Sequence, residues 1–324
     1  MKVALDIGCS DVKLSYFNDK KEIICKVTPS LVRSGKASVN ISGKSGFTYQ
    51  ADDEDWSIND DYLNSEDTRF SSYQFSSLNR VLMVHALYQH LPDKQRFEVA
   101  TGLPVDQYFV NGVVSEKNID LKHVNVEKSV ESKHFKKNVK SRNVCPEAVS
   151  AWVDICFDNK GKQVQKITQP VAIVDIGGRT TDVAIVTPDF SIEPSSTGTL
   201  KVGILDAYNL LNTKLMAQHY LDTNIDIFVL SEAFKSNEIQ IDMSKVRDIS
   251  KLVKEIKQSI ASKILREVER KIDKVPHLQG ICFVGGGAEA LRQNLKTLGG
   301  NIFIPRDAVF SNCRGYLKIL HNYI

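Results

Sequence analysis

The sequence lacks the cysteine spacing and the charge excess by which several protein classes are recognised. Its six cysteines are scattered, and no two of them form a Cys-x-x-Cys pair. A zinc site or a disulfide framework would need closely spaced cysteines, so both are disfavoured and a reducing compartment is indicated. The net charge is only +3, which is too small for a dedicated nucleic-acid-binding protein.

Long hydrophobic runs and long flexible linkers are missing as well. No apolar segment approaches the roughly 20 residues of a membrane-spanning helix, and the N-terminus reaches Asp6 without the apolar core of a signal peptide. No long segment rich in proline, glycine and serine separates the two halves of the chain. We therefore expect a cytoplasmic globular protein of about two closely packed domains from these 324 residues.

One pattern occurs twice in the chain. Residues 3–17 (VALDIGCSDVKLSYF) and 173–186 (IVDIGGRTTDVAIV) share an apolar run, then Asp-Ile-Gly, small polar residues and a second alternating run. The alternation predicts strand, turn and strand, whereas a Walker-type loop or a dinucleotide-binding loop leads into a helix. Either turn alone could be an ordinary β-hairpin turn. The repetition favours two clamps that close on one nucleotide from two sides.

The residue types in these turns suit phosphate binding. Glycine permits a tight turn and a close approach of the backbone to a ligand. Successive N–H groups and hydroxyls then form a concavity for phosphate oxygens. The carboxylates of Asp6 and Asp175 would repel a bare phosphate, so they indicate a Mg²⁺ ion between them, held directly or through water.

Two further segments are candidates for the same site. The sequence FVGGGAEAL (283–291) reads as a strand, a glycine turn and a helix, which would bring a helix N-terminus near an anionic ligand. In CPEAVSAWVDICF (145–157), Pro146 suits the first position of a helix, with Glu147 in the first turn. Glu147 either stabilises the helix dipole or positions a water molecule at the terminal phosphate.

Helical periodicity predicts further elements. Helices are expected over residues 76–91, 204–221 and 250–272 and in the tail after Val309, and a strand is expected over 97–104. His85 falls on an apolar helical face and is interpreted as a core or capping histidine. Residues 51–67 carry a net charge of −8 and residues 117–142 one of +5. Such runs are usually solvated faces, but here they would also suit head-to-tail assembly.

Taken together, these motifs resemble the actin/heat-shock-chaperone/sugar-kinase superfamily. Within it the chain is similar to the plasmid-segregation actins of the ParM/StbA family. The segments that carry this resemblance occur in family order: DIGCSDVKL, VLMVHALY, ATGLPVDQY, PEAVSAW, VDIGGRTTDVAIV and FVGGGAEAL. It implies an α/β, actin-like (ribonuclease H-like) duplicated fold of two domains with mixed five-stranded sheets flanked by helices. The expected boundaries are 1–165 plus about 308–324 for the first domain, and 166–307 for the second.

The resemblance also implies roles for single residues. The first phosphate loop would comprise Asp6, Gly8, Ser10 and Lys13, and the second Asp175, Gly177, Gly178, Thr180 and Thr181, with Asp182 at its end. The nucleoside would be lined by Gly285, Gly286, Gly287 and Glu289, with other contacts from the 250–272 helix. Glu147 would polarise the attacking water, and Asp175 would hold the hydrated metal with Asp6. Asp11 and Arg179 depart from the residues that the family often carries in the two loops.

The implied function is an ATP hydrolase that polymerises into filaments in a nucleotide-dependent way to segregate plasmid DNA. Its ligands would be ATP, or GTP, with Mg²⁺. Its partners would be further copies of itself and a centromere-binding adaptor protein that holds the plasmid DNA, with no membrane partner. A sugar-type small-metabolite kinase and a nucleotide-bound scaffold without turnover are the alternatives. A chaperone ATPase is disfavoured, because no substrate-binding domain follows the ATPase core in this sequence.

Overall fold

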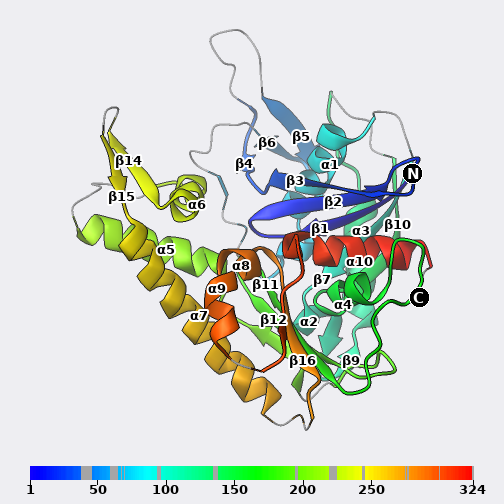
Figure 1. Cartoon of the computed structure of the whole chain (residues 1–324). Helices are drawn as coiled ribbons and strands as arrows, with labels where there is room; N and C mark the ends of the chain where they lie inside the picture. The colour runs from blue at the N-terminus through cyan, green and yellow to red at the C-terminus, as the bar shows by residue number, and fades with distance from the viewer. Residues whose placement is uncertain are drawn as a thin grey trace.

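Two five-stranded sheets and the helices around them make up most of the protein. The computed structural model describes residues 1–37, 46–58, 65–66, 68, 70–92, 96–133, 138–193, 196–218, 225–242, 245–273, 275, 277–298 and 300–322. Part of the acidic segment 51–67 and part of the basic segment 117–142 lie outside the described residues. The chain begins in one sheet, passes to the other and returns to the first through its last helix (Figure 1).

The first sheet has the strand order β10-β7-β1-β2-β3. Its strands are β1 (Lys2–Ile7), β2 (Asp11–Phe17), β3 (Ile23–Pro29), β7 (Phe97–Leu103) and β10 (Val139–Pro146). Strands β1, β2 and β3 form an antiparallel meander, whereas β7 and β10 run parallel to β1. The sheet is therefore mixed, as predicted.

The second sheet repeats this topology in the order β13-β12-β11-β16-β17. Its strands are β11 (Val171–Ile176), β12 (Thr181–Val186), β13 (Gly198–Leu200), β16 (Gly280–Val284) and β17 (Ile302–Phe303). Strands β11, β12 and β13 are again antiparallel, and β16 and β17 again run parallel to the central strand. The duplication inferred from the two Asp-Ile-Gly turns thus extends to whole sheets.

The helices cover both sheets. They are α1 (Ser77–His90), α2 (Val105–Tyr108), α3 (Glu116–Glu127), α4 (Val149–Cys156), α5 (Ile204–Ala217), α6 (Ile227–Ser236), α7 (Ser250–Ile272), α8 (Gly286–Ala290), α9 (Arg292–Leu295) and α10 (Ser311–Leu320). Short 3-10 turns are η1 (Tyr73–Phe75), η3 (Lys296–Leu298) and η4 (Ala308–Phe310). The predicted helices at 76–91, 204–221, 250–272 and in the tail are confirmed, α7 with the predicted ends. Residues 219–221 of the second prediction lie outside the described residues.

Three small antiparallel sheets complete the described chain. They consist of β4 (Arg33–Ser34), β5 (Phe47–Ala51) and β6 (Glu54–Ile58); β8 (Phe109–Val110) and β9 (Val113–Val114); and β14 (Glu238–Asp242) and β15 (Lys245–Asp248). Trp56 of the acidic segment is buried in β6.

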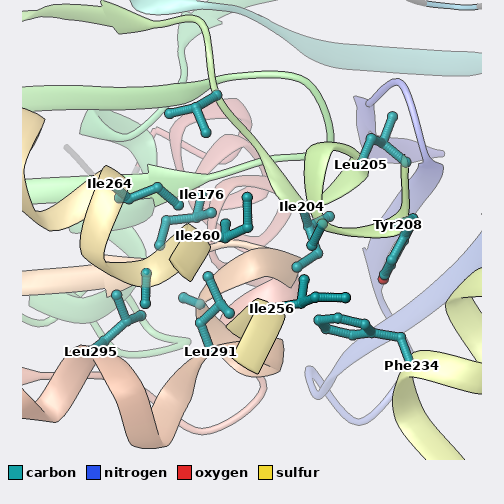
Figure 2. Packing of buried hydrophobic residues seen from close by; sticks show 14 of the residues in the cluster. Ile176, Ile204, Leu205, Tyr208, Phe234, Ile256, Ile260, Ile264, Leu291 and Leu295 are labelled. Atoms are coloured by element: carbon teal, nitrogen blue, oxygen red, sulfur yellow. The ribbon is translucent and has the colours of Figure 1, made fainter. Parts of the chain in front are cut away.

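The longest helix, α7, shows why the second sheet holds together. Its buried side chains recur at helical spacing, from Leu252 and Val253 to Val268, so that one face is apolar and the opposite face is charged. This face packs in the cluster that covers one side of the second sheet. Figure 2 labels members of that cluster: Ile176, Ile204, Leu205, Tyr208, Phe234, Ile256, Ile260, Ile264, Leu291 and Leu295.

Strand alternation decides what the other side of each sheet carries. In β11, Ala172, Val174 and Ile176 face the α7 cluster, whereas Val171 and Ile173 pack with α4. In β1, Ala4 packs with α10. Asp175 comes two residues after Ile173, and Asp6 comes two residues after Ala4. Both aspartates therefore lie on the sheet faces that look toward the helix pair α4 and α10.

One predicted element boundary is wrong. Pro146 does not begin a helix: it is the last residue of β10, opposite Leu103 of β7. The N–H of Glu147 extends this ladder by donating to the Leu103 carbonyl at 2.9 Å. Helix α4 begins only at Val149. Proline is tolerated here because β10 lies at the edge of its sheet.

Candidate functional site

The two Asp-Ile-Gly segments form turns of the same geometry. The N–H of Gly8 donates to the carbonyl of Asp11 at 3.1 Å, and the N–H of Gly177 donates to the carbonyl of Thr180 at 2.9 Å. Each turn joins the first and second strands of its sheet. The predicted strand–turn–strand arrangement is therefore confirmed for both.

The turns face each other across the two sheets. A Cβ atom added to Gly178 would lie 2.3 Å from the Ser10 hydroxyl oxygen, so the Ser10 side chain would have to move aside for any larger residue. Ser10 Oγ is buried and has no hydrogen-bond partner within the described part of the chain. An unpaired buried hydroxyl is costly unless a ligand or water satisfies it. The pair of turns thus has the polar groups and the closeness that a phosphate chain requires.

Each turn is fixed by hydrogen bonds to its own carbonyl groups. The Gly8 carbonyl accepts from Ser30 Oγ at 2.8 Å and from the Tyr73 hydroxyl at 3.0 Å. In the second turn, the carbonyls of Gly177 and Gly178 accept the N–H groups of Ile204 and Leu205, at the start of α5. Because the carbonyls are held from behind, the turns are preorganised before any ligand binds.

Asp6 sits opposite a cation. It pairs across the hairpin with Lys13, whose Nζ lies 3.9 Å from Asp6 Oδ2. Burial raises the pKa of Asp6, and the nearby Lys13 lowers it. Burial lowers the pKa of Lys13, but the surrounding carboxylates, Asp6 first, raise it overall. Lys13 is therefore kept charged at the place where it was predicted to meet phosphate.

Asp175 sits opposite a second carboxyl group instead. Its cross-strand neighbour is Asp182, which accepts hydrogen bonds from the Val105 N–H at 3.2 Å and from the Thr199 hydroxyl. Burial first, and then the Asp6 charge, raises the pKa of Asp175 to about 6. Burial also raises the pKa of Asp182 to about 8, with Asp175 adding to it.

Glu147 completes a cluster of carboxyl groups. Its pKa is raised well above the usual value, by burial first and then by the charges of Asp6, Asp182 and Asp175. Its carbonyl accepts the N–H of Val149 at 2.7 Å, so Glu147, Ala148 and Val149 form a γ-turn with Ala148 at φ 61°. Glu147 thus belongs to neither glycine turn, yet it lies within electrostatic reach of both.

The carboxyl cluster fits a divalent cation that is shared with phosphate. Buried carboxyl groups that raise one another's pKa are stabilised when a cation lies between them. Within the described residues no three His, Cys, Asp or Glu side chains stand close enough to hold a metal ion by themselves. Mg²⁺ keeps several waters and usually takes one or two carboxylates together with substrate phosphates. Asp6 and Asp175 match that kind of site.

The predicted nucleoside loop packs directly on the second turn. Gly285 has φ +88°, and a Cβ there would lie 2.2 Å from Asp175 Oδ1. A Cβ on Gly287 would collide with Ile176. Glu289 is already engaged, because its carboxylate accepts from the Ala308 N–H at 2.9 Å and pairs with Arg292 at 2.7 Å. The nucleoside contacts of Gly285, Gly286, Gly287 and Glu289 stay predictions.

Some residues that were predicted to bind phosphate make hydrogen bonds within the second sheet and its turn instead. Thr181 is fully buried and donates its hydroxyl to the Val202 carbonyl at 2.8 Å, while Thr180 contributes its carbonyl to the turn. Arg179 lies near enough to Cys9 of the opposite turn to lower the pKa of that thiol, although burial dominates and raises it to about 11.

Two residues near the carboxyl cluster were not predicted. Lys122 of α3 is fully buried, and its charge lowers the pKa of Glu147. Asn312 of α10 donates to Asp175. Neither lies in a motif with a local signal, because each reaches the site from a distant helix.

Comparison with protein families divides the chain into two matches. Residues 1–157 match the family described as plasmid segregation protein ParM, N-terminal. Residues 173–297 match the family described as archaeal actin homologue MreB-like, C-terminal. The first part of the chain is thus similar to ParM, and the second part to an archaeal actin homologue. Comparison with curated protein sequences finds no match.

Solved structures similar to this actin-like chain extend over nearly its whole length. An archaeal actin homologue in complex with ADP has a TM-score of 0.78 and 17% identity, covering 99% of both chains. A 15-stranded ParM filament from Clostridium botulinum has a TM-score of 0.74 and 18% identity, again covering 99% of both. Bacillus thuringiensis ParM with ATP has a TM-score of 0.69 and 13% identity, covering 99% of this chain and 98% of that one. At these identities the likeness shows the fold, and the resemblance to the ParM/StbA family is confirmed by the N-terminal match.

Proposed function

We propose that this actin-like chain binds ATP with Mg²⁺ between its two glycine turns and hydrolyses it. The observation that carries this proposal is the approach of Gly178 to the unpartnered Ser10 hydroxyl. The charges of Asp6 and Asp175, which lie near the ends of the strands before the two turns, also act on Glu147. The ADP and ATP in the similar structures support a nucleoside triphosphate as the ligand. GTP satisfies the same phosphate contacts.

In this proposal the chain's residues divide the work of phosphoryl transfer. The turn N–H groups, Ser10 and Lys13 would bind and orient the phosphates, and Asp6 and Asp175 would hold the metal. When bound, Mg²⁺ supplies positive charge to the phosphate oxygens. Glu147 accepts a proton from the attacking water. Burial gives this carboxyl a high proton affinity, and the positive charge of bound Mg²⁺ would keep it ionised so that it can accept the proton.

We further propose that nucleotide binding controls assembly into filaments that segregate plasmid DNA through a centromere-binding adaptor. The filament of a similar ParM and the N-terminal family match support this role. Assembly can respond to the nucleotide only if the ligand distinguishes two arrangements of the chain. A ligand that contacts both turns meets this condition, because the turns belong to different sheets.

The proposed domain division remains 1–165 with 308–324, and 166–307. It is supported by the packing of α10 on the first sheet, through a cluster that contains Ala4, Ala100 and Cys145. Helix α4, by contrast, packs on Val171 and Ile173 of the second sheet. Each sheet is thus covered by the helix that follows the last strand of the other one. No helix within the described residues is long and apolar enough to cross a lipid bilayer.

One experiment tests the proposed catalysis. Phosphate release and light scattering are followed over time in the same sample for the wild type, Glu147→Ala and Asp175→Ala. Loss of Glu147 should slow hydrolysis by roughly 10²–10⁴-fold while ATP binding changes little, since the lost interaction acts mainly in the transition state. Its filaments should then outlast those of the wild type. Asp175→Ala should lose both metal placement and turnover.

The matched control is Glu98→Ala. Glu98 is an exposed carboxylate at the far end of β7 that pairs with Arg142 at 2.7 Å. This variant should hydrolyse ATP and assemble like the wild type. If Glu147→Ala and Asp175→Ala do so as well, the catalytic proposal is wrong. Transfer of the phosphate to an added sugar would instead indicate a kinase.

A further inference from the structure

Asn312 contacts two functional elements at once, one from each half of the chain. The residue lies in α10 and is 5% exposed. Its Nδ2 donates a hydrogen bond to Asp175 Oδ2, and its Oδ1 accepts the N–H of Ala148 at 3.0 Å. One amide side chain thus links the carboxylate at the end of β11 to the γ-turn that carries Glu147.

The two sheets differ at this point. Asp6 faces Lys13 across its hairpin, whereas Asp175 faces Asp182. Asp175 therefore has a like-charged neighbour where Asp6 has a cation. Asn312 supplies a donor to Asp175, and this hydrogen bond favours its ionised form. The residue holds one carboxylate oxygen in place without adding charge.

The other hydrogen bond holds a strained segment. Ala148 has φ 61° and ψ −53°, a conformation that is strained for a residue with a side chain. Such a turn persists only where neighbouring groups determine it. The Ala148 N–H points to Asn312, and the Glu147 N–H is held by the Leu103 carbonyl. The N–H group of Glu147 and that of the next residue are thereby both fixed.

Helix α10 is a firm support for this amide. The Cys313 carbonyl accepts from Ser15 Oγ of the first sheet at 2.9 Å. Lys318 Nζ donates to Asp154 Oδ1 at 2.8 Å and to the Phe157 carbonyl at 2.6 Å. α10 is thus fastened to the first sheet next to Asn312, and to the α4 segment farther along the helix.

We propose that Asn312 is a positioning residue for ATP hydrolysis, which sets the Glu147 carboxylate relative to Asp175. This inference rests on the proposed function, because it assigns to Asn312 the alignment of the proposed base with the proposed metal-holding carboxylate. Asn312 touches neither phosphate nor water in this role. It acts through the two residues that do.

Two variants separate its hydrogen bonds. Asn312→Leu has a similar volume and loses both bonds. Asn312→Asp still offers an oxygen to the Ala148 N–H, but it has no donor for Asp175. We expect kcat to fall about 10²-fold in Asn312→Leu, the cost of a misplacement of about 1 Å. The fall in Asn312→Asp should be similar, because the new carboxylate also places a like charge against Asp175. The Kd for ATP, measured with a fluorescent analogue, should stay within about threefold of the wild type.

A double-mutant cycle with Glu147→Ala distinguishes positioning from a general structural role. If Asn312 acts partly through Glu147, Asn312→Leu should lower kcat by less than about tenfold when Glu147 is already alanine. Asn312→Asp keeps the hydrogen bond from the Ala148 N–H, so it should lower kcat by the same factor in the wild type and in Glu147→Ala. Tyr49→Phe is the structural control: it removes a buried hydrogen bond to His85, away from α10, so it should lower the melting temperature and leave kcat unchanged.

The results that overturn the inference are definite. The inference is overturned if kcat is unchanged in Asn312→Leu. It is also overturned if Asn312→Leu lowers kcat by the same factor in the wild type and in Glu147→Ala. If Asn312→Leu does not fold, Asn312→Asp decides, and a wild-type kcat in that variant rejects the role. If Glu147→Ala and Asp175→Ala themselves hydrolyse ATP normally, the proposed function fails. If they are inactive while both Asn312 variants match the wild type, only the positioning role fails.

Discussion

At the scale of single residues, buried polar groups in this protein have specific partners. His85 lies in α1 with 4% of its surface exposed, and its Nδ1 is 2.8 Å from the Tyr49 hydroxyl. Its interpretation as a core histidine is confirmed. Burial first, and then the charge of His90, lowers the pKa of His85 to about 4. The folded protein therefore keeps this imidazole neutral.

This shift predicts an acid-sensitive stability. The unfolded chain takes up a proton at His85 near pH 6.5, whereas the folded chain does so only near pH 4. Between these values the unfolded state binds more protons, so stability falls as the pH falls. The slope contributed is at most about 1.4 kcal/mol per pH unit, or about 3 kcal/mol in total.

The measurement is urea unfolding of the wild type and His85→Gln from pH 7.5 to pH 4.5. Glutamine still offers an acceptor to Tyr49 but does not titrate. The difference in free energy of unfolding between the two proteins should shrink steadily as the pH drops below 6.5. A difference that is constant over this range would show that His85 titrates alike in both states.

At the scale of elements, the crossing of α4 and α10 joins the two halves. Gly315 of α10 lies directly against α4, where an added Cβ would be 1.8 Å from the Ser150 carbonyl oxygen. Glycine therefore lets the two backbones approach. Ser150 is itself small and buried, and it donates its hydroxyl to the Pro146 carbonyl at 2.8 Å. The crossing places Asn312 and the Glu147 turn side by side.

Gly315→Val should therefore separate the helices. Overpacking of this kind costs about 1–3 kcal/mol or more, and here the obstacle is backbone, which cannot rotate away. We expect a lower denaturant midpoint and slower ATP hydrolysis together. The control is Gly286→Ala, where the new Cβ would lie 3.6 Å from Val309, an ordinary contact. The expectation fails if Gly315→Val is as stable as Gly286→Ala.

At the scale of the whole molecule, the acidic and basic segments neighbour each other within one chain. Asp52 pairs with Arg80 at 2.9 Å and with Lys128 of the basic segment at 4.0 Å. The backbones of Gln50 and Glu131 also form a bridge. Part of the charge expected for head-to-tail assembly is therefore neutralised inside the chain, and the role of both segments in assembly stays a prediction.

A ligand that contacts both turns should stabilise both halves together. At a concentration of 100 times its Kd, a ligand adds about 2.7 kcal/mol to the free energy of unfolding. Calorimetry with ATP and Mg²⁺ should raise the melting temperature by several degrees, and chelating the metal with EDTA should remove most of the gain. Ser10→Ala should reduce it. If the halves melt separately and ATP shifts only one transition, the ligand does not bridge the two turns.

The sequence by itself determined the repeat, the type of most helices and strands, and the presence of carboxylates at the candidate site. Strand–turn–strand follows from local alternation and glycine, and α7 follows from its 3.6-residue periodicity, so neither needs distant contacts. The two Asp-Ile-Gly turns also located Asp6 and Asp175 on matching positions of two sheets. These features depend on residues that are close in sequence, so local sequence patterns are enough to predict them.

Only the tertiary structure decided how those pieces meet. Pairing of β10 with β7 kept Pro146 in a strand and moved Glu147 into a γ-turn, overriding the local preference of proline for a helix start. Asn312 reaches Asp175 across 137 positions of sequence, and Ala148 across 164. Such contacts arise because α10 packs back on the first sheet against α4. That packing reflects complementary surfaces of distant elements, which no local pattern in the chain encodes.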